Sequence, residues 1–210
     1  MSGAAAQRRT RANGEASRQR ILDAAAEIAG ERGYEGTTIN LVSRQSGLPA
    51  SSIYWHFRDK DDLIAAVIDR SFGRWAELLG RPVRAPVGAS RDEALRAMLR
   101  RTGDALDRQP DFLRLGLLLV LERRPAELLA RRRFVEARRA TRVRTTALYR
   151  ALFAGLDDAA VAALVTTTLA LADGLFVASQ AGELELADGF DLMATTVLAA
   201  ARSFGGDPPG

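Results

Sequence analysis

Residues 37–62 constrain the fold of this chain more than any other stretch, because they encode two short helices joined by a glycine turn. Thr37 and Thr38 are suitable caps for the start of the first helix, which carries apolar residues at helical spacing. Gly47 lies where the turn after that helix needs a left-handed backbone, and Pro49 suits the first turn of the second helix. The stretch therefore predicts a helix-turn-helix.

The second of these helices has an inward face and an outward face. Ile53 and Phe57 lie four residues apart and are expected to anchor the helix inward. Successive residues point about 100° apart, so the polar and aromatic residues beside them cannot all be buried. A short helix that exposes hydroxyl, indole and imidazole groups is typical of a recognition helix in the major groove of DNA. The alternative is a surface helix with partly buried aromatic residues. The candidate DNA contacts on it are Ser51, Ser52, Tyr54, Trp55 and His56.

Composition excludes several kinds of chemistry. The 210 residues include no cysteine and one histidine, which excludes disulfides, cysteine nucleophiles and zinc sites with cysteine or several histidine ligands. Carboxylates alone could hold magnesium or calcium, but no EF-hand spacing occurs. No nucleophile elbow or phosphate-cradling glycine loop occurs either, so we expect no catalytic residue, no metal and no cofactor. A helical enzyme, or a binding module whose turn motif only packs, is the remote alternative.

Hydropathy predicts a cytoplasmic protein without a membrane partner. The N-terminus carries charge but no apolar signal core. The longest weakly polar run, residues 159–172, contains three threonines and is interrupted by Asp173. It is shorter than the roughly 20 apolar residues that a membrane-spanning helix needs.

The positive charge is concentrated near the N-terminus. Residues 1–60 hold nine basic and six acidic residues, so they account for +3 of the net charge of +4. This asymmetry predicts a polyanion-binding face at that end. Lys60, the only lysine, lies at the expected start of a helix, where backbone amides favour an anion. The alternative is a solvated surface charge. Thr38 and Asn40 are further candidates for phosphate contact, although Thr38 could serve only as a cap.

Helical periodicity runs through the whole chain and no alternating strand pattern occurs, so we predict an all-α fold of about nine helices. Residues 1–14 are expected to be a disordered basic arm. A helix-turn-helix domain over 15–79, a loop over 80–90, a second helical domain over 91–204 and a frayed tail over 205–210 are expected to follow. Helices are expected near residues 17–32 and 59–79, then near 91–108, 110–123, 125–154, 157–182 and 188–204.

The N-terminal sequence is similar to a known family. The segments Arg20-Ile-Leu-Asp-Ala-Ala, Gly33-Tyr-Glu-Gly-Thr-Thr-Ile and Ile53-Tyr-Trp-His-Phe-Arg-Asp-Lys-Asp-Asp-Leu resemble the DNA-binding domain of TetR-family repressors. The resemblance covers about residues 15–75, and Ser46 replaces the alanine usual in the turn. It implies a three-helix DNA-binding domain in which Lys60 contacts phosphate.

The same resemblance implies partners. It implies a homodimer that binds a near-palindromic double-stranded DNA operator, with a C-terminal helical domain for effector binding and dimerisation. A small apolar or amphipathic effector would then release a repressor from DNA. A DNA-binding activator, or a regulator without an effector, is the alternative function.

Small residues recur every fourth position from 162 to 182 and form one ridge that permits close helix packing. The family uses its last two long helices for a four-helix dimer interface, so we predict that this ridge lies there. The alternative is that the ridge packs within one subunit. The predicted interface residues are Thr166, Ala170, Gly174 and Ala178.

Residues 112–121 are apolar on nearly every side of the expected helix, which must therefore be enclosed by other helices. With apolar residues of neighbouring helices they could line a ligand cavity, oriented by a few polar groups. The alternative is a solid core. The predicted ligand-binding residues are Phe112, Leu115, Leu119, Phe134, Leu148, Leu152, Asp173, Phe176 and Gln180.

The segment 123–150 contains ten arginines against Glu127 and Glu136. An anionic effector or a second polyanion surface would use such a charge. We favour the simpler interpretation that the arginines form the solvated face of a long helix.

Overall fold

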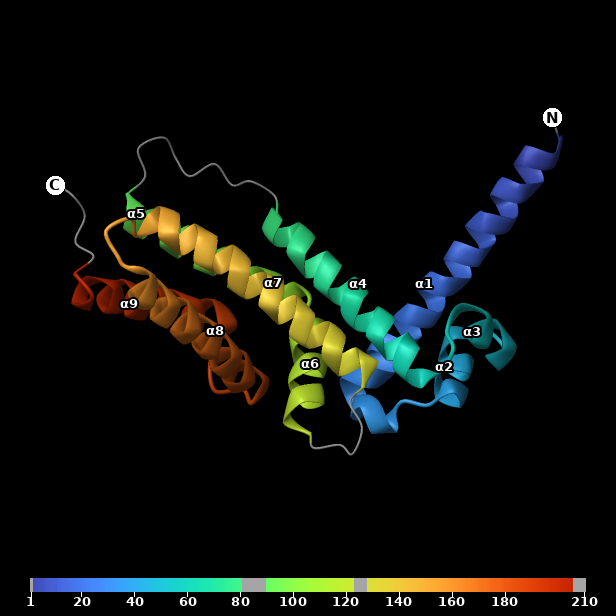
Figure 1. Cartoon of the computed structure of the whole chain (residues 1–210). Helices are drawn as coiled ribbons and strands as arrows, with labels where there is room; N and C mark the ends of the chain where they lie inside the picture. The colour runs from blue at the N-terminus through green and yellow to red at the C-terminus, as the bar shows by residue number, and fades with distance from the viewer. Residues whose placement is uncertain (1, 81–89, 123–127, 206–210) are drawn as a thin grey trace. The chain divides into compact units, whose positions relative to one another are not determined.

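The computed structural model describes residues 2–80, 90–122 and 128–205, and within these ranges every regular element is a helix. The predicted all-α fold is confirmed (Figure 1). Most of the predicted loop at 80–90 and tail at 205–210 lies outside the described residues. The described helices are α1 (Ser2–Gly36), α2 (Ile39–Ser46), α3 (Ala50–His56), α4 (Lys60–Gly80), α5 (Arg91–Arg108), α6 (Asp111–Leu121), α7 (Leu129–Leu152), α8 (Asp158–Gln180) and α9 (Leu186–Ser203).

α1 is longer than the sequence predicts. It begins at Ser2, so the prediction of a disordered arm is wrong for residues 2–14. Alanine and arginine, both strong helix formers, are frequent in this segment, and no proline occurs before Pro49. Figure 1 shows the segment continuing the helix to the N-terminal end. The backbone leaves helical geometry at Gly33, with φ 66° and ψ −174°, where the sequence predicts the end of the first helix.

The chain divides into two compact units that do not follow the predicted boundary at 80–90. The first unit comprises Met1–Gly73 and Asp111–Val135, and the second comprises Arg74–Pro110 and Glu136–Gly210. α6 and the first turns of α7 therefore belong with the helix-turn-helix rather than with the remaining C-terminal helices.

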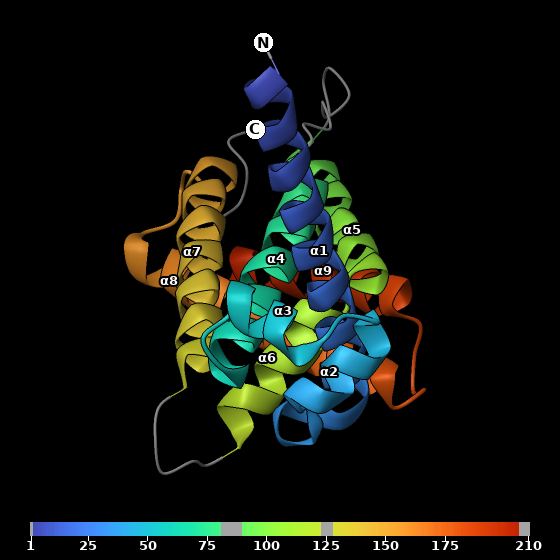
Figure 2. The ribbon, with the colours of Figure 1, turned by 90° about the vertical axis from the view of Figure 1, so that its right-hand side faces the viewer.

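The first unit is organised around α1, against which α2 and α3 lie (Figure 2). Aromatic side chains extend its core into α6 and α7. The rings of Phe72 and Phe112 are 5.1 Å apart between centroids, and those of Phe112 and Phe134 are 5.2 Å apart. Gly116 leaves room for this packing, because an ideal Cβ there would lie 2.0 Å from the Phe134 ring. Other buried residues of this core are Ile21, Leu22, Val42, Ile53, Leu63, Ile64 and Ile68.

In the second unit α9 packs on both α5 and α8. The absence of a side chain at Gly103 admits the ring of Phe190, which would lie 3.0 Å from an added Cβ. The hydroxyls of Tyr149 and Thr168 form a buried hydrogen bond of 2.9 Å, and burial raises the pKa of Tyr149 to about 12. This unit therefore has a core of its own, separate from that of the helix-turn-helix.

α8 is an apolar helix with much of its surface uncovered. Its 23 residues and a mean hydropathy of 1.9 make it long and apolar enough, by length and composition, to cross a membrane. Residues 159–172, the apolar run identified in the sequence, form only part of this helix. A core helix of a soluble protein meets the same criteria, but only 33% of the apolar window of α8 is buried. Such an exposed apolar surface is typical of an interaction site.

Candidate nucleic-acid interface

The predicted turn between α2 and α3 is present. The Thr38 hydroxyl accepts a hydrogen bond from the Leu41 amide at 3.2 Å, which caps α2. Gly47 ends α2 in the left-handed region, with φ 65°. An ideal Cβ at this glycine would lie 3.2 Å from the guanidinium of Arg20, so both backbone strain and space favour glycine here. Pro49 precedes α3 as its N-cap residue.

Hydrogen bonds from α1 fix the orientation of α2. The Arg20 guanidinium donates to the carbonyl of Ser46 at 2.6 Å, at the end of α2 where backbone carbonyls lack helical partners. The Gln45 side chain donates to Glu27 at 2.9 Å. Sequence reasoning missed Arg20, because its partner lies 26 residues away and is a backbone atom.

α3 turns one face to the core and another to solvent, as predicted. Ile53 has no exposed surface and Phe57 is 4% exposed. Tyr54 is 56% exposed and Trp55 is 76% exposed, and Ser51 is also exposed. Ser52 and His56 are half-buried. Contact between these residues and DNA stays a prediction.

His56 and Trp55 form a small aromatic cluster at the end of α3. Their rings meet edge to face with centroids 4.5 Å apart. Burial, and then the positive charge of Arg18, lower the pKa of His56 below its usual 6.5, so the imidazole is neutral at pH 7. A neutral imidazole would hydrogen-bond to a phosphate rather than pair with it as a cation.

Lys60 is held within the protein. Its ammonium group donates to the carbonyl of Tyr34 at 3.2 Å and to the carboxylate of Glu35 at 3.3 Å, and lies 4.2 Å from the centre of the Tyr34 ring. Its side chain is 27% exposed. Thr38 and Asn40, the other predicted phosphate contacts, are exposed. A DNA phosphate would therefore have to compete with Glu35 for the lysine.

Residues 21–67 match the model of the family described as bacterial regulatory proteins, tetR family. This chain carries a TetR-family helix-turn-helix domain. Over 61 residues it is 38% identical to the HTH-type transcriptional regulator SrpR of Pseudomonas putida. The match covers 29% of this chain and 29% of that relative. The similarity in sequence therefore concerns the TetR domain, about three-tenths of the relative's length.

Solved structures resemble the chain over most of its length. A TetR-like transcriptional regulator from Rhodococcus sp. RHA1 has a TM-score of 0.69 at 21% identity, covering 91% of this chain and 97% of that one. FadR from Bacillus subtilis, crystallised in complex with stearoyl-CoA, has a TM-score of 0.64 at 18% identity, and the match covers 90% of this chain and 99% of that one. At these identities the likeness establishes the all-α fold.

The predicted ligand-binding residues fall into two groups. Phe112, Leu115, Leu119 and Phe134 are buried in the same unit as the TetR domain, where aromatic rings pack against each other. The other five belong to the second unit: Leu148 is 39% exposed, Leu152 and Asp173 are half-buried, Phe176 is buried and Gln180 is exposed. Asp173 accepts two hydrogen bonds from Arg138, at 2.8 and 2.7 Å. The nine residues therefore do not lie in one compact unit, which differs from the predicted C-terminal effector domain.

The ridge of small residues on α8 faces outward. Thr166, Ala170 and Gly174 are exposed and Ala178 is half-buried. An ideal Cβ at Gly174 would meet no atom within 4 Å. The ridge is therefore largely uncovered, although the Thr166 hydroxyl accepts a hydrogen bond from Arg142 of α7 at 3.0 Å. Its place in a dimer interface stays a prediction.

Proposed function

We propose that this protein is a dimeric transcriptional regulator that binds a near-palindromic DNA operator through its TetR domain. The observation that carries the proposal is the face of α3, which exposes Tyr54 and Trp55 while Ile53 and Phe57 anchor the helix in the core. Exposed aromatic and hydroxyl groups on a rigidly held short helix suit contact with base edges and phosphates.

A homodimer would present two such helices. The outward ridge on α8 supports the proposal, because small exposed residues let a second helix approach closely. α9 adds Leu192, which is 64% exposed. A two-fold dimer reads half-sites about 34 Å or more apart, which requires a near-palindromic operator.

The proposed effector is a small apolar or amphipathic molecule that releases a repressor from its operator. The likeness in fold to FadR, whose structure contains stearoyl-CoA, supports an effector of this chemical class. In this chain the Arg138–Asp173 pair is a candidate for the polar group that orients it, because its side chains are 32% and 25% exposed. A compound that raises the melting temperature and also weakens DNA binding would support this part of the proposal.

Selection from a random DNA pool tests the DNA-binding proposal. We expect enrichment of a near-palindromic motif, and binding that weakens steeply with salt because phosphate contacts release counterions. Electrophoretic mobility shifts on the selected DNA at several salt concentrations would measure both effects. A pool that returned no enriched sequence would contradict the proposal.

The contact between Lys60 and Glu35 gives a sharper test of the phosphate assignment. Lys60→Ala should weaken binding about equally on all sequences and lower the salt slope by about one. Glu35→Gln should strengthen binding about two- to fivefold, because it removes a surface partner that competes with phosphate.

The control is Glu31→Gln, which removes an equal charge from an exposed residue near the C-terminal end of α1. It measures the general effect of charge on DNA affinity, and titrations of the three variants should separate that effect from release of Lys60. Equal gains for Glu35→Gln and Glu31→Gln would mean that Glu35 does not compete with DNA for the lysine.

A further inference from the structure

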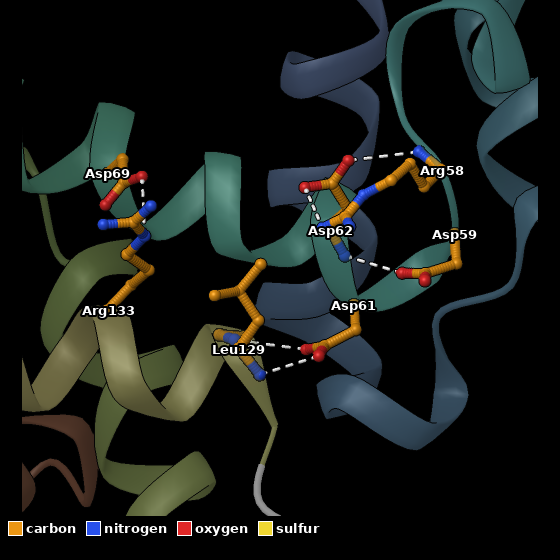
Figure 3. Close-up of polar contacts among 8 residues, drawn as sticks. Arg58, Asp59, Asp61, Asp62, Asp69, Leu129 and Arg133 are labelled. Carbon is orange, nitrogen blue, oxygen red and sulfur yellow. Dashed lines mark hydrogen bonds and ion pairs between the residues drawn. The ribbon is translucent and has the colours of Figure 1, made fainter.

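Asp61 lies in the first turn of α4, immediately after Lys60, and three residues separate α3 from α4. Its carboxylate does not cap its own helix. The two oxygens accept hydrogen bonds from the backbone amides of Leu129, at 2.7 Å, and Ala130, at 3.1 Å (Figure 3). These are the first two residues of α7, and both helices belong to the first unit at this point.

A carboxylate suits the start of α7. The first amides of a helix have no helical acceptor, and a negative charge at that end is favourable. α7 has no acidic residue in its first turn. It has Arg131, Arg132 and Arg133 there instead. Because Ala130 is fully buried, water does not readily replace Asp61 as the acceptor.

The neighbouring acidic residues have local tasks. Asp59 accepts from the amide of Asp62 at 2.8 Å, and Asp62 accepts from the amide of Arg58 at 3.1 Å. That backbone hydrogen bond is the main reason why the pKa of Asp62 is lowered. Both residues therefore stabilise the turn from α3 into α4. In Figure 3, Asp61 is the member of this turn that reaches α7.

A second contact between α4 and α7 is weaker. Asp69 and Arg133 are 3.6 Å apart, with side chains 55% and 46% exposed. Water screens such a pair, and exposed ion pairs contribute little to stability. The hydrogen bonds of Asp61 are therefore the stronger polar link between the two helices.

We propose that Asp61 is a positioning residue for DNA binding: it ties the turn that carries α3 and Lys60 to the N-terminus of α7. α7 continues past Val135 into the second unit, where Arg138 and Tyr149 bind α8. A shift of α7 would thus reach the recognition helix through Asp61. The consequence for DNA binding rests on the function proposed above, whereas the coupling of α7 to α3 does not.

Amide hydrogen exchange in the full chain tests the coupling without DNA. The Leu129 and Ala130 amides report directly on the contact, and the Phe57 amide, bonded to the Ile53 carbonyl at 2.9 Å, reports on α3. Loss of hydrogen bonds to a charged group should speed exchange about tenfold or more. In Asp61→Ala we expect faster exchange at both reporters, the two α7 amides and the Phe57 amide. Asp61→Asn keeps one oxygen acceptor and should have a smaller effect.

Asp69→Asn is the matched control, because it removes an equal charge from the exposed contact between Asp69 of α4 and Arg133 of α7 and should leave both reporters unchanged. Faster exchange in Asp61→Ala at α7 alone would overturn the proposal and leave Asp61 as a cap for α7 only. On selected DNA, Asp61→Ala should bind about tenfold more weakly than the wild type, and Asp69→Asn should bind equally well. A wild-type protein that bound no DNA would refute the proposed function, while the exchange result would still decide the coupling.

Discussion

Replacing Gly116 with alanine is expected to lower the free energy of unfolding by about 1–3 kcal/mol, the usual cost of an overpacked core, or by more. The added Cβ would lie 2.0 to 2.5 Å from three ring carbons of Phe134. Phe134 has no exposed surface, and the ring of Phe112 stands 5.2 Å from its own. The ring therefore cannot move aside without disturbing the contact between α6 and α7. Chemical denaturation of both proteins would measure the loss.

Gly73→Ala is the matched control. Gly73 lies within α4 in the same unit, and an added Cβ there would meet no atom within 4 Å. Alanine in a helix is favoured over glycine by about 0.5–1 kcal/mol, so this variant should be slightly more stable than the wild type. If both variants were equally stable, the close contact between Gly116 and Phe134 would not exist in solution.

Local signals explain why much of the fold follows from the sequence. The bounds of α5 agree with the predicted residues 91–108 because Ser90 and Glu93 form a reciprocal capping box at its start. In the TetR domain, Gly47 adopts the left-handed conformation that the turn requires, and Ile53 is buried. The sequence signal for each of these features lies in residues fewer than about ten positions apart, so periodicity and capping chemistry reveal them.

Contacts between distant segments could not be predicted in this way. The apolar α6 indicates burial, but its sequence does not reveal that it packs on α1. Asp61 has the pattern of an ordinary first-turn acid, whose expected role is to stabilise its own helix. Its partner gave no signal either, because the helix predicted at 125–154 has Glu127 in its first turn, whereas α7 begins at Leu129 and has no acid there. The pairing of Lys60 with Glu35 joins residues 25 positions apart and leaves no local pattern.

The outward ridge of α8 leads to the second large effect. Gly174→Leu should raise the dissociation constant of the proposed dimer by about 10- to 100-fold, because a large side chain would overpack a closely approaching helix. Within one subunit the same change should be harmless, since a Cβ at Gly174 meets no atom within 4 Å. Leucine also favours a helix more than glycine does, by less than about 1 kcal/mol. The variant is therefore expected to stay folded and to dissociate into monomers at concentrations where the wild type is dimeric.

Sedimentation velocity over a range of concentrations would measure the loss of dimer, and circular dichroism would check the fold. Ala97→Leu adds the same side chain at an exposed position of α5 in the same unit and should leave the dimer intact. Because a near-palindromic operator is held by two recognition helices, Gly174→Leu should also lose most of its affinity for DNA that carries both half-sites. A variant that remained dimeric would show that this stretch of α8 does not meet a second subunit, and the dimer would then have to use another surface.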